Sequence, residues 1–459
     1  MGDLGHHHEH LDGHHGHLDR DQGHAHGHHE HLDGHHGHFD GPHGHGPAHR
    51  PAHAPGRPPS ATSRRALLGA AGGLLFLAAA PGTAQAATTR TAQDGRAVAA
   101  ATRSGAGRAS LITQGTTLVH ADLHNHTAMS DGDGDPALAF GSMREAGLDV
   151  AALTDHSGVF TIGGLSSSEW RRTGELADAA DVPGVYTAIR GFEWTHALLG
   201  HANVWFSDSY VDMSAAPGMN ALFNWLDDKD AVAGFNHPGR EELRFNEFGH
   251  NAAVHDRMVS LEMFNRTDDY LFEGWSSGRS SPLVACLNAG WRTGLTGVTD
   301  EHGTDWGFPE GKGRSGLWVT ENTRAGVLEA MRARRFFATR VSGLRLDATA
   351  AGVRMGGLLP FPAGDVNFRV DLDRGTAWAG RPLHIQVLRP GSRAPEVVDV
   401  IETASGRITD FTVPLNSADG TWVVLRVSDP GRANASPGPA GHPCNDWGVA
   451  YSSPWWLKG

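Results

Sequence analysis

Cysteine, long apolar runs and a basic surface are what this 459-residue sequence lacks. Its two cysteines, Cys286 and Cys444, are too few for a disulfide scaffold or a cysteine-rich zinc module, so either one bridge or two buried thiols is expected. The formal net charge is −13 without any basic stripe, which argues against a specific nucleic-acid partner. No apolar run beyond the N-terminal region is long enough for a bilayer, so we expect no membrane span in the mature form. No Gly-x-Ser-x-Gly motif indicates a serine nucleophile.

Histidine is in excess, with 31 residues, and 19 of these lie in the first 53 positions. Residues 1–60 form a His-rich, low-complexity leader that we predict to be disordered, because it has almost no large apolar side chains. Its segment 7–19 recurs at 28–40 with Phe39 in place of Leu18. The leader is either a loose metal-binding tail, which could supply ions before its removal, or a tolerated disordered one.

Residues 61–86 resemble a twin-arginine export signal. Arg64 and Arg65 precede a mild apolar run that ends at Pro81, and Ala84-Gln85-Ala86 offers a cleavage site. We therefore expect the export machinery to be a partner and the mature protein to be secreted, with an uncleaved anchor as the alternative. Residues 87–115 have no periodicity and are predicted to be a linker.

Residues 116–340 alternate short apolar runs with helical patterns, which predicts an α/β domain. Asp135 is expected to cap a helix whose apolar face carries Leu138, Met143 and Ala146. Thr323 is expected to cap a second helix. Residues 341–459 contain alternating segments between turns, at 366–370, 384–388, 397–401 and 422–427, which indicates a β-rich, sandwich-like domain.

The first candidate metal ligands occur in Asp122-Leu123-His124-Asn125-His126. A strand repeats every two residues, so the acid and both histidines would share one face. Two imidazoles that close together can bind one metal ion, and Asp122 is available to orient one of them.

Similar residues recur where later predicted strands end. They are His156 in Thr-Asp-His, Glu193 in Gly-Phe-Glu-Trp, His201 in Gly-His-Ala-Asn, His237 in Asn-His-Pro, and Asp300 and His302 in Thr-Asp-Glu-His. A hydrogen-bonded core histidine explains any one of these well, but it explains so many at strand ends poorly.

This ordered set resembles the PHP (polymerase and histidinol phosphatase) superfamily. The stretch 120–126 with Ser130-Asp131-Gly132 is similar to its first motif, Thr-Asp-His to its second and Asn-His-Pro to its third. Thr-Asp-Glu-His stands where the family usually has Ser-Asp-Ala-His. The resemblance covers about 116–340 and implies a distorted (β/α)7 barrel with metals at the strand ends. Thr339 and residues 450–455 also resemble an exported branch grouped with enzymes that hydrolyse the carbamate carbaryl.

The resemblance implies two or three divalent ions, and imidazole and carboxylate ligands suit Zn, Mn or Fe. Position by position, the first ion would be held by His124, His126, Glu193 and Asp300. Glu193 would bridge to a second ion completed by His201 and His237, with His196 as a rival to His201. The third ion would be held by His156 and His302, with Asp131 where several relatives have His or Asp.

These ligands predict a hydrolase that uses a metal-bridging hydroxide to cleave a small-molecule ester, and the signal segment predicts that it is exported. A phosphoesterase is the leading hypothesis, because Arg240, Arg266 and Arg314 are candidates to bind an anionic group. The alternative for each arginine is a surface or ion-pair role. The rival functions are hydrolysis of a carboxylester, carbamate or amide and, more remotely, a secreted metal-binding protein without activity.

Overall fold

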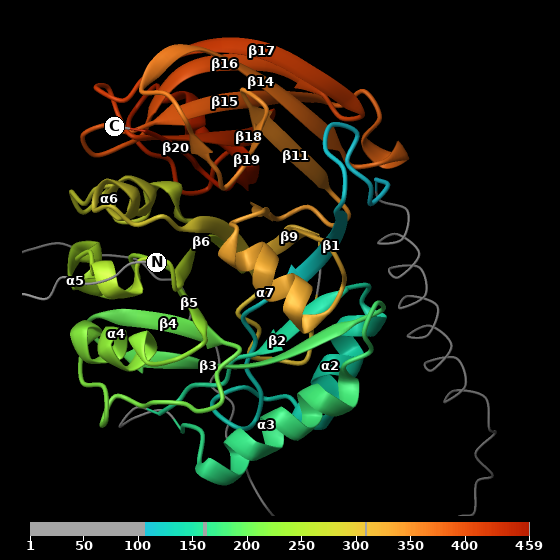
Figure 1. The fold of residues 1–459 in the computed structure, drawn as a ribbon, viewed down its shortest axis with the longest axis vertical. Helices are drawn as coiled ribbons and strands as arrows, with labels where there is room; N and C mark the ends of the chain where they lie inside the picture. Colours follow the sequence, from blue (N-terminus) through green and yellow to red (C-terminus); the bar gives the residue numbers. More distant parts are fainter. Residues whose placement is uncertain (1–105, 159–162, 308–309, 459) are drawn as a thin grey trace, which may run out of the picture. The chain divides into compact units, whose positions relative to one another are not determined.

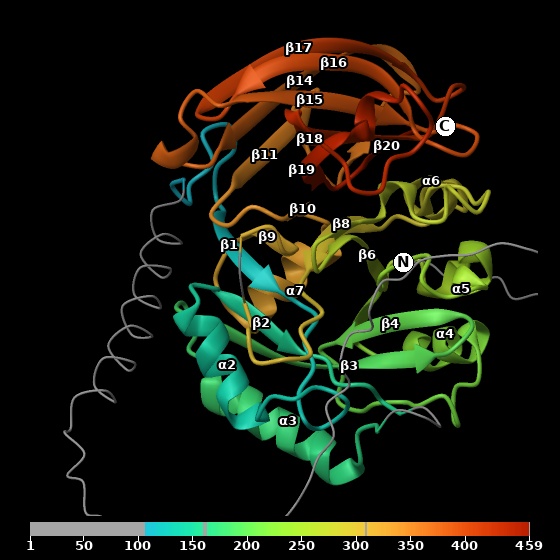
Figure 2. The ribbon, with the colours of Figure 1, turned by 180° about the vertical axis from the view of Figure 1, so that it is seen from behind.

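The computed structural model describes residues 106–158, 163–307 and 310–458, which Figures 1 and 2 show from opposite sides. The predicted leader, the signal segment and most of the linker lie outside the described residues. The described part has a mixed α/β fold, as the sequence predicts. None of its helices is long and apolar enough to cross a bilayer. The predicted domain boundaries stay predictions.

The strands of the first part are β1 (Thr117–Asp122), β2 (Val150–Leu153), β3 (Thr187–His196), β4 (Gly200–Trp205), β5 (Val232–Phe235), β6 (Met258–Asn265), β7 (Asp268–Asp269), β8 (Gly294–Val298) and β9 (Arg314–Val319). They pair in the order β9, β1, β2, β3, β4, β5, β6, and β8 pairs with the other edge of β6. Strand β8 also lies against β9. There Ser315 Oγ accepts from the amide of Gly297 at 3.2 Å and donates to the carbonyl of Gly297 at 2.9 Å. Strands β8 and β9 are therefore neighbours.

Strand direction decides which ends meet. The pairs β1–β2, β2–β3, β5–β6 and β6–β8 are parallel, so their carboxyl ends lie at one edge. Strand β4 is antiparallel to both β3 and β5, so its amino end lies there instead. A ligand at the start of β4 can therefore meet ligands that follow β1, β2 and β5.

The helices are α2 (Pro136–Glu145), α3 (Ser167–Ala180), α4 (Met219–Asp227), α5 (Arg244–Phe248), α6 (Pro282–Asn288) and α7 (Arg324–Arg332). The short 3-10 turns are η1 (Ala252–Val254), η2 (Tyr270–Phe272), η3 (Thr376–Trp378) and η4 (Pro443–Asn445). Helices α2 and α3 lie side by side over β2 and β3 in both views.

The predicted helix caps are confirmed. Asp135 accepts from the amide of Ala137, and Thr323 accepts from that of Gly326. The predicted apolar face of α2 is wrong at Leu138, which is 62% exposed, whereas Met143 is fully buried. Five residues correspond to about 140° around a helix, so these two side chains point to different faces.

The later strands are β10 (Phe336–Thr339), β11 (Arg345–Ala350), β12 (Val353–Arg354), β13 (Leu358–Leu359), β14 (Ala363–Asp373), β15 (Pro382–Arg389), β16 (Glu396–Ala404), β17 (Arg407–Asn416), β18 (Trp422–Ala433), β19 (Asp446–Ser452) and β20 (Trp455–Leu457). The four segments predicted beyond residue 341 lie within β14, β15, β16 and β18. Strands β12, β11, β14 and β17 form a separate sheet. Strand β19 pairs with β10 and β18, so the later strands continue the first sheet.

A buried polar network links β15, β18 and β19 to β7. Arg426 donates to Tyr451 Oη at 3.0 Å and to Gln386 Oε1 at 2.7 Å, and it forms an ion pair with Asp446. Tyr451 in turn donates to Asp269 Oδ1 at 2.8 Å. We call these five residues the Arg426 network. Its members come from both parts of the chain, so it holds them together.

Cys286 and Cys444 are both buried and free, which agrees with the expectation of two thiols rather than a bridge. Burial is the main cause that raises the pKa of each thiol to about 12. Neither is therefore a reactive thiolate at neutral pH.

Candidate metal centre

The predicted ligands meet at the shared edge of the strands. His124 and His126 follow β1, and His156 follows β2. Glu193 lies within β3. The other predicted ligands are Asp131 between β1 and α2, His201 in antiparallel β4, His237 after β5, and Asp300 and His302 after β8.

Buried tryptophans hold the loop that carries the first two histidines. Trp205 Nε1 donates to the carbonyl of Leu123 at 2.9 Å, and Trp306 Nε1 donates to that of His126 at 3.0 Å. Gly134 allows this packing, because a Cβ there would lie 2.1 Å from the Trp306 ring. The loop is thus fixed from both sides.

Glu193 is the hub of the cluster. Its buried carboxylate lies within 3.5 Å of five imidazoles, and Asn236 donates to its Oε1 at 2.6 Å. The distances are 3.2 Å to His124, 3.5 Å to His126, 2.7 Å to His156, 3.3 Å to His201 and 3.3 Å to His237. One carboxylate cannot balance five positively charged rings, so bound protons or cations must satisfy the remaining ring nitrogens.

The first group with metal-ligand geometry contains His124, His126 and Asp300. The two Nε2 atoms face each other at 3.1 Å, and Asp300 Oδ1 lies 3.4 and 3.2 Å from them. Burial is the largest cause that lowers the pKa of His126 to about 3, so this ring is neutral and able to bind a cation. Asp300 has a φ of 49°, a left-handed conformation that a non-glycine residue seldom adopts away from functional sites.

A second group contains His126, Asp131, His156 and His302. Asp131 is its most exposed member, with side-chain exposure of 31%. Its carboxylate lies 3.5 Å from His156 Nε2 and 3.4 Å from His302 Nε2. Burial would raise the pKa of the Asp131 carboxyl, but hydrogen bonds from these two rings outweigh it and lower the pKa. This group is the part of the cluster that solvent reaches most easily.

The remaining groups contain His201. One joins it to His156 and Glu193, and the other joins it to His237 and Glu241. Gly200 before it has a φ of 118°, and a Cβ there would lie 2.6 Å from the Phe245 ring. His196, the rival candidate, caps the turn instead, because its Nδ1 accepts from the amides of Leu198 and Leu199.

The pKa values of several side chains in the cluster differ strongly from their usual values. Burial lowers the pKa of His156, but Glu193 and Asp131 outweigh it and raise the pKa to about 10. Burial also opposes protonation of His237, but Glu193 and Glu241 raise its pKa to about 9. Burial would raise the pKa of Glu193, yet the charges on the surrounding histidines hold the pKa well below its usual value.

The donor set fits divalent cations. Four buried ligand atoms have no hydrogen-bond partner among the described residues, namely Glu193 Oε2, His201 Nδ1, His237 Nδ1 and Glu241 Oε2. A buried polar group left unpaired costs about 1–3 kcal/mol. Cations would satisfy the first two of these atoms, and imidazole with carboxylate ligands suits Zn, Mn or Fe.

The sequence missed Glu262, a lone acid on buried β6. It lies 2.8 Å from His124 Nδ1, accepts from the amide of His237 at 2.7 Å and accepts from Asn265 Nδ2 at 2.9 Å. The expectation that Asp122 orients a ligand ring is wrong. Its carboxylate instead accepts from the amide of Thr299 at 3.1 Å and from the hydroxyl of that residue. An acid within an apolar strand is the signal that could have pointed to Glu262.

The three predicted substrate arginines lie in different surroundings. Arg240 donates to Asp300 Oδ2 at 3.0 Å and to Asn265 Oδ1 at 2.8 Å. Arg266 donates to the Asp300 carbonyl at 3.2 Å, and its side chain is 47% exposed. Arg314 is buried in β9 and belongs to none of the four groups. Arg266 therefore has the most guanidinium surface to offer a substrate.

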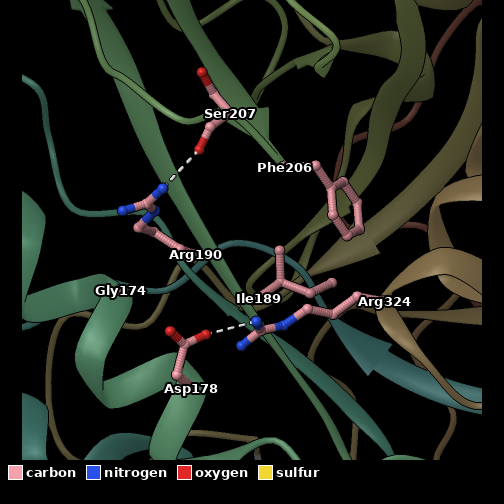
Figure 3. Close-up of a pocket in the computed structure, with 7 residues that line it drawn as sticks. All are labelled: Gly174, Asp178, Ile189, Arg190, Phe206, Ser207 and Arg324. Atoms are coloured by element: carbon pink, nitrogen blue, oxygen red, sulfur yellow. Dashed lines mark hydrogen bonds and ion pairs between the residues drawn. The ribbon is translucent and has the colours of Figure 1, made fainter.

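A pocket of about 250 Å³ lies elsewhere, and no predicted ligand lines it (Figure 3). Both arginines that line it already donate hydrogen bonds to other residues. Arg190 donates to the carbonyl of Ser207 at 3.0 Å, and Arg324 donates to Asp178 at 2.6 Å. None of the residues that line this pocket belongs to a group with metal-ligand geometry.

Residues 109–238 are similar to the family described as a protein of unknown function, DUF3604. This stretch carries His124, His126, His156, Glu193, His201 and His237. No curated protein matches the chain.

Three solved structures resemble parts of it. A two-domain protein from Bacteroides vulgatus, described as containing a predicted PHP-like metal-dependent phosphoesterase, is 17% identical, covers 76% of this chain and 99% of its own, and has a TM-score of 0.39. A provisionally assigned metal-dependent phosphoesterase from Bifidobacterium adolescentis is 14% identical, with coverage of 42% and 90% and a TM-score of 0.28. An amidohydrolase from Chromobacterium violaceum, with bound sulfate and no metal, is 12% identical, with coverage of 41% and 90% and a TM-score of 0.26. At these identities and TM-scores the similarities carry no argument about function, so the function must be argued from the geometry of the site.

Proposed function

We propose that this protein is a multinuclear metal-dependent hydrolase with a distorted PHP-type barrel and a C-terminal β-rich domain. The observation that carries the proposal is the Glu193 carboxylate among five imidazoles, with ligand atoms left unpaired around it. The motif resemblance supports it independently, since its nine predicted ligands all fall within the four groups. When bound, two or three divalent ions would act as Lewis acids and supply a hydroxide nucleophile near neutral pH.

The chain's own residues prepare this site. Glu193 would hold neighbouring ions at a fixed spacing, because His124 and His237 face its Oε1 while His156 faces its Oε2. Glu262 orients His124 and fixes the backbone of His237. Asp131 and His302 are the most exposed of the predicted ligands, with side-chain exposures of 31% and 28%, so substrate would enter on their side.

A phosphoester is the substrate class we favour. Arg266 lies beside His302, with its Nη2 3.0 Å from the ring Nδ1, and about half of its side chain is exposed. A guanidinium there can bind a phosphate oxygen as the ester reaches the solvent-facing group. Arg240 is the weaker candidate, because Asp300 and Asn265 already occupy its donors.

Carboxylester, carbamate or amide hydrolysis is the second candidate. Leu198 and Leu243 are 51% and 44% exposed, and they are joined by a backbone hydrogen bond of 2.8 Å. They lie close in sequence to His201 and Glu241, so they offer an apolar surface to an aryl or alkyl group near the cluster.

A substrate panel separates these activities. The metal-loaded protein is assayed with bis-(p-nitrophenyl) phosphate, p-nitrophenyl acetate and a naphthyl carbamate. We expect the highest kcat/KM for the phosphate ester, and Arg266→Ala should lower this value while sparing the acetate. A preference for acetate or carbamate would support the second candidate. No turnover by folded, metal-loaded protein would leave only the metal-binding protein.

We also propose that the chain is exported through a twin-arginine signal, on the strength of Arg64 and Arg65 before the apolar run. Replacing both arginines with lysine should retain the protein in the cytoplasm. Unchanged export of that variant would contradict the proposal.

A further inference from the structure

Glu241 is the acid in the four groups that no predicted motif contained. It follows His237 by four residues in the loop after β5. Its Oε1 lies 3.6 Å from His237 Nδ1 and 3.8 Å from His201 Nε2. The side chain is only 11% exposed, and its Oε2 has no hydrogen-bond partner among the described residues. A buried carboxylate oxygen without a hydrogen bond is unfavourable, so its position in the fold calls for an explanation.

The two histidines each lie between two carboxylates. His201 turns Nδ1 to Glu193 at 3.3 Å and Nε2 to Glu241, whereas His237 turns Nε2 to Glu193 at 3.3 Å and Nδ1 to Glu241. An imidazole that binds a cation through one nitrogen carries its proton on the other. A carboxylate that receives this N–H fixes both the tautomer and the ring orientation.

The loop holds Glu241 in place without help from its carboxylate. Arg279 donates to the carbonyl of Glu241 at 3.4 Å and to that of Glu242 at 2.6 Å. On the inner side, Glu262 accepts from the amide of His237. Glu242 shares this anchoring, yet it is exposed and contacts none of the ligands. The two adjacent acids differ mainly in what their side chains face.

We propose that Glu241 is a positioning residue that receives the outer N–H of both His201 and His237. It thereby selects the nitrogen that each ring presents toward Glu193. This inference rests on the proposed function, because it requires a cation held by Glu193, His201 and His237. Glu241 acts through the rings and does not touch the substrate.

The test compares full-length Glu241→Gln, Glu241→Ala and Glu241→Asp with the matched control Glu242→Gln. Zinc affinity is measured by chelator competition, and the thermal midpoint of the metal-free protein is measured alongside. The His-rich leader is common to all variants and cancels in the comparison. We expect zinc affinity to fall about 10–100-fold in Glu241→Ala, less in Glu241→Gln, and to be partly restored in Glu241→Asp. Glu242→Gln should match the wild type.

Some fall in the metal-free midpoint of Glu241→Gln is expected, because the variant removes a carboxylate that faces both histidines, so zinc affinity is the deciding measurement. Wild-type affinity in Glu241→Ala would overturn the inference. A fall in the metal-free midpoint without a loss of affinity would also overturn it and would assign Glu241 a structural role. If the wild type itself binds no zinc, the proposed function fails. If it binds zinc and hydrolyses ester while Glu241→Ala binds equally well, only this inference fails.

Discussion

The Arg426 network and the histidine cluster around Glu193 are both buried and polar, and they differ in how their charges are paired. In the Arg426 network a buried guanidinium faces Asp446, and Asp269 lies 3.7 Å from it. Around Glu193, histidine nitrogens face one another, as in the 3.1 Å contact between His124 and His126, and ligand atoms lack partners. A buried cluster in which opposite charges meet can hold the fold together without a ligand. A cluster in which histidine nitrogens converge needs bound protons or cations to complete it.

The largest predicted effect comes from Glu193→Gln. The amide keeps the shape but removes the charge on which neighbouring ions depend, so we expect hydrolysis to fall to background. The metal-free protein should keep its fold, because the substitution adds no bulk to the buried site. Initial rates and circular dichroism check this, and substantial remaining activity would contradict the bridging role.

In the Arg426 network the effect should be on stability instead. Arg426→Met leaves Asp446 and Asp269 without their guanidinium, and breaking a buried ion pair in this way costs about 3–5 kcal/mol. Urea denaturation measures the free energy of unfolding, while metal stoichiometry should stay the same. Arg369→Met is the matched control, because its pair with Asp410 is exposed and should contribute at most about 1 kcal/mol. Equal losses of unfolding free energy in the two variants would show that the buried network stabilises the fold no more than an exposed ion pair does.

Glu262→Gln should act on the metal centre alone. The carboxylate contacts His124 Nδ1 behind the ligand face, and loss of such a partner weakens metal affinity about 10–100-fold. Glu301→Gln is the control, because this acid lies between Asp300 and His302 in sequence but pairs with Lys312 at 2.6 Å. Isothermal titration with zinc distinguishes the two, and similar affinities would argue against an orienting role for Glu262.

The smallest effect is a pH dependence of the metal-free protein. The pKa values of His156 and His237 are raised to about 10 and about 9, burial being outweighed by Glu193 and its neighbouring acids. A raised pKa means that protonation stabilises the fold fully below about pH 6.5, and that this stability is lost as the pH rises through 9 to 10. The thermal midpoint should therefore fall across that range.

Metal loading should suppress this fall, because bound imidazoles are already neutral. Glu193→Gln should reduce it as well, since Glu193 raises both pKa values. Arg426 contributes nothing in this range, because Tyr451 and the acids around it outweigh burial and hold its pKa above the usual value. An identical pH dependence with and without metal would contradict this account of the cluster.

The sequence predicted which candidate ligands come together better than it predicted the residues that contact them. Histidines and acids at strand ends stand out because such residues are rare in apolar segments, and the structure brings all nine together. Glu262 and Glu241 could not be assigned in this way, because their roles depend on which strands and loops lie beside His124 and His237. Leu138 shows a similar limit, since its burial depends on how α2 is turned over the sheet. The long-range pairing of β10 with β19 also depends on tertiary contacts that no local pattern records.

The most direct test of the central claim is anomalous diffraction from crystals of the zinc-loaded protein, with data on both sides of the zinc absorption edge. The account predicts two or three peaks at about 2.0–2.3 Å from the histidine and carboxylate atoms around Glu193. It predicts that these peaks disappear or weaken in Glu193→Gln. An ordered cluster with no peak beside Glu193, in crystals that bind zinc elsewhere, would contradict the account.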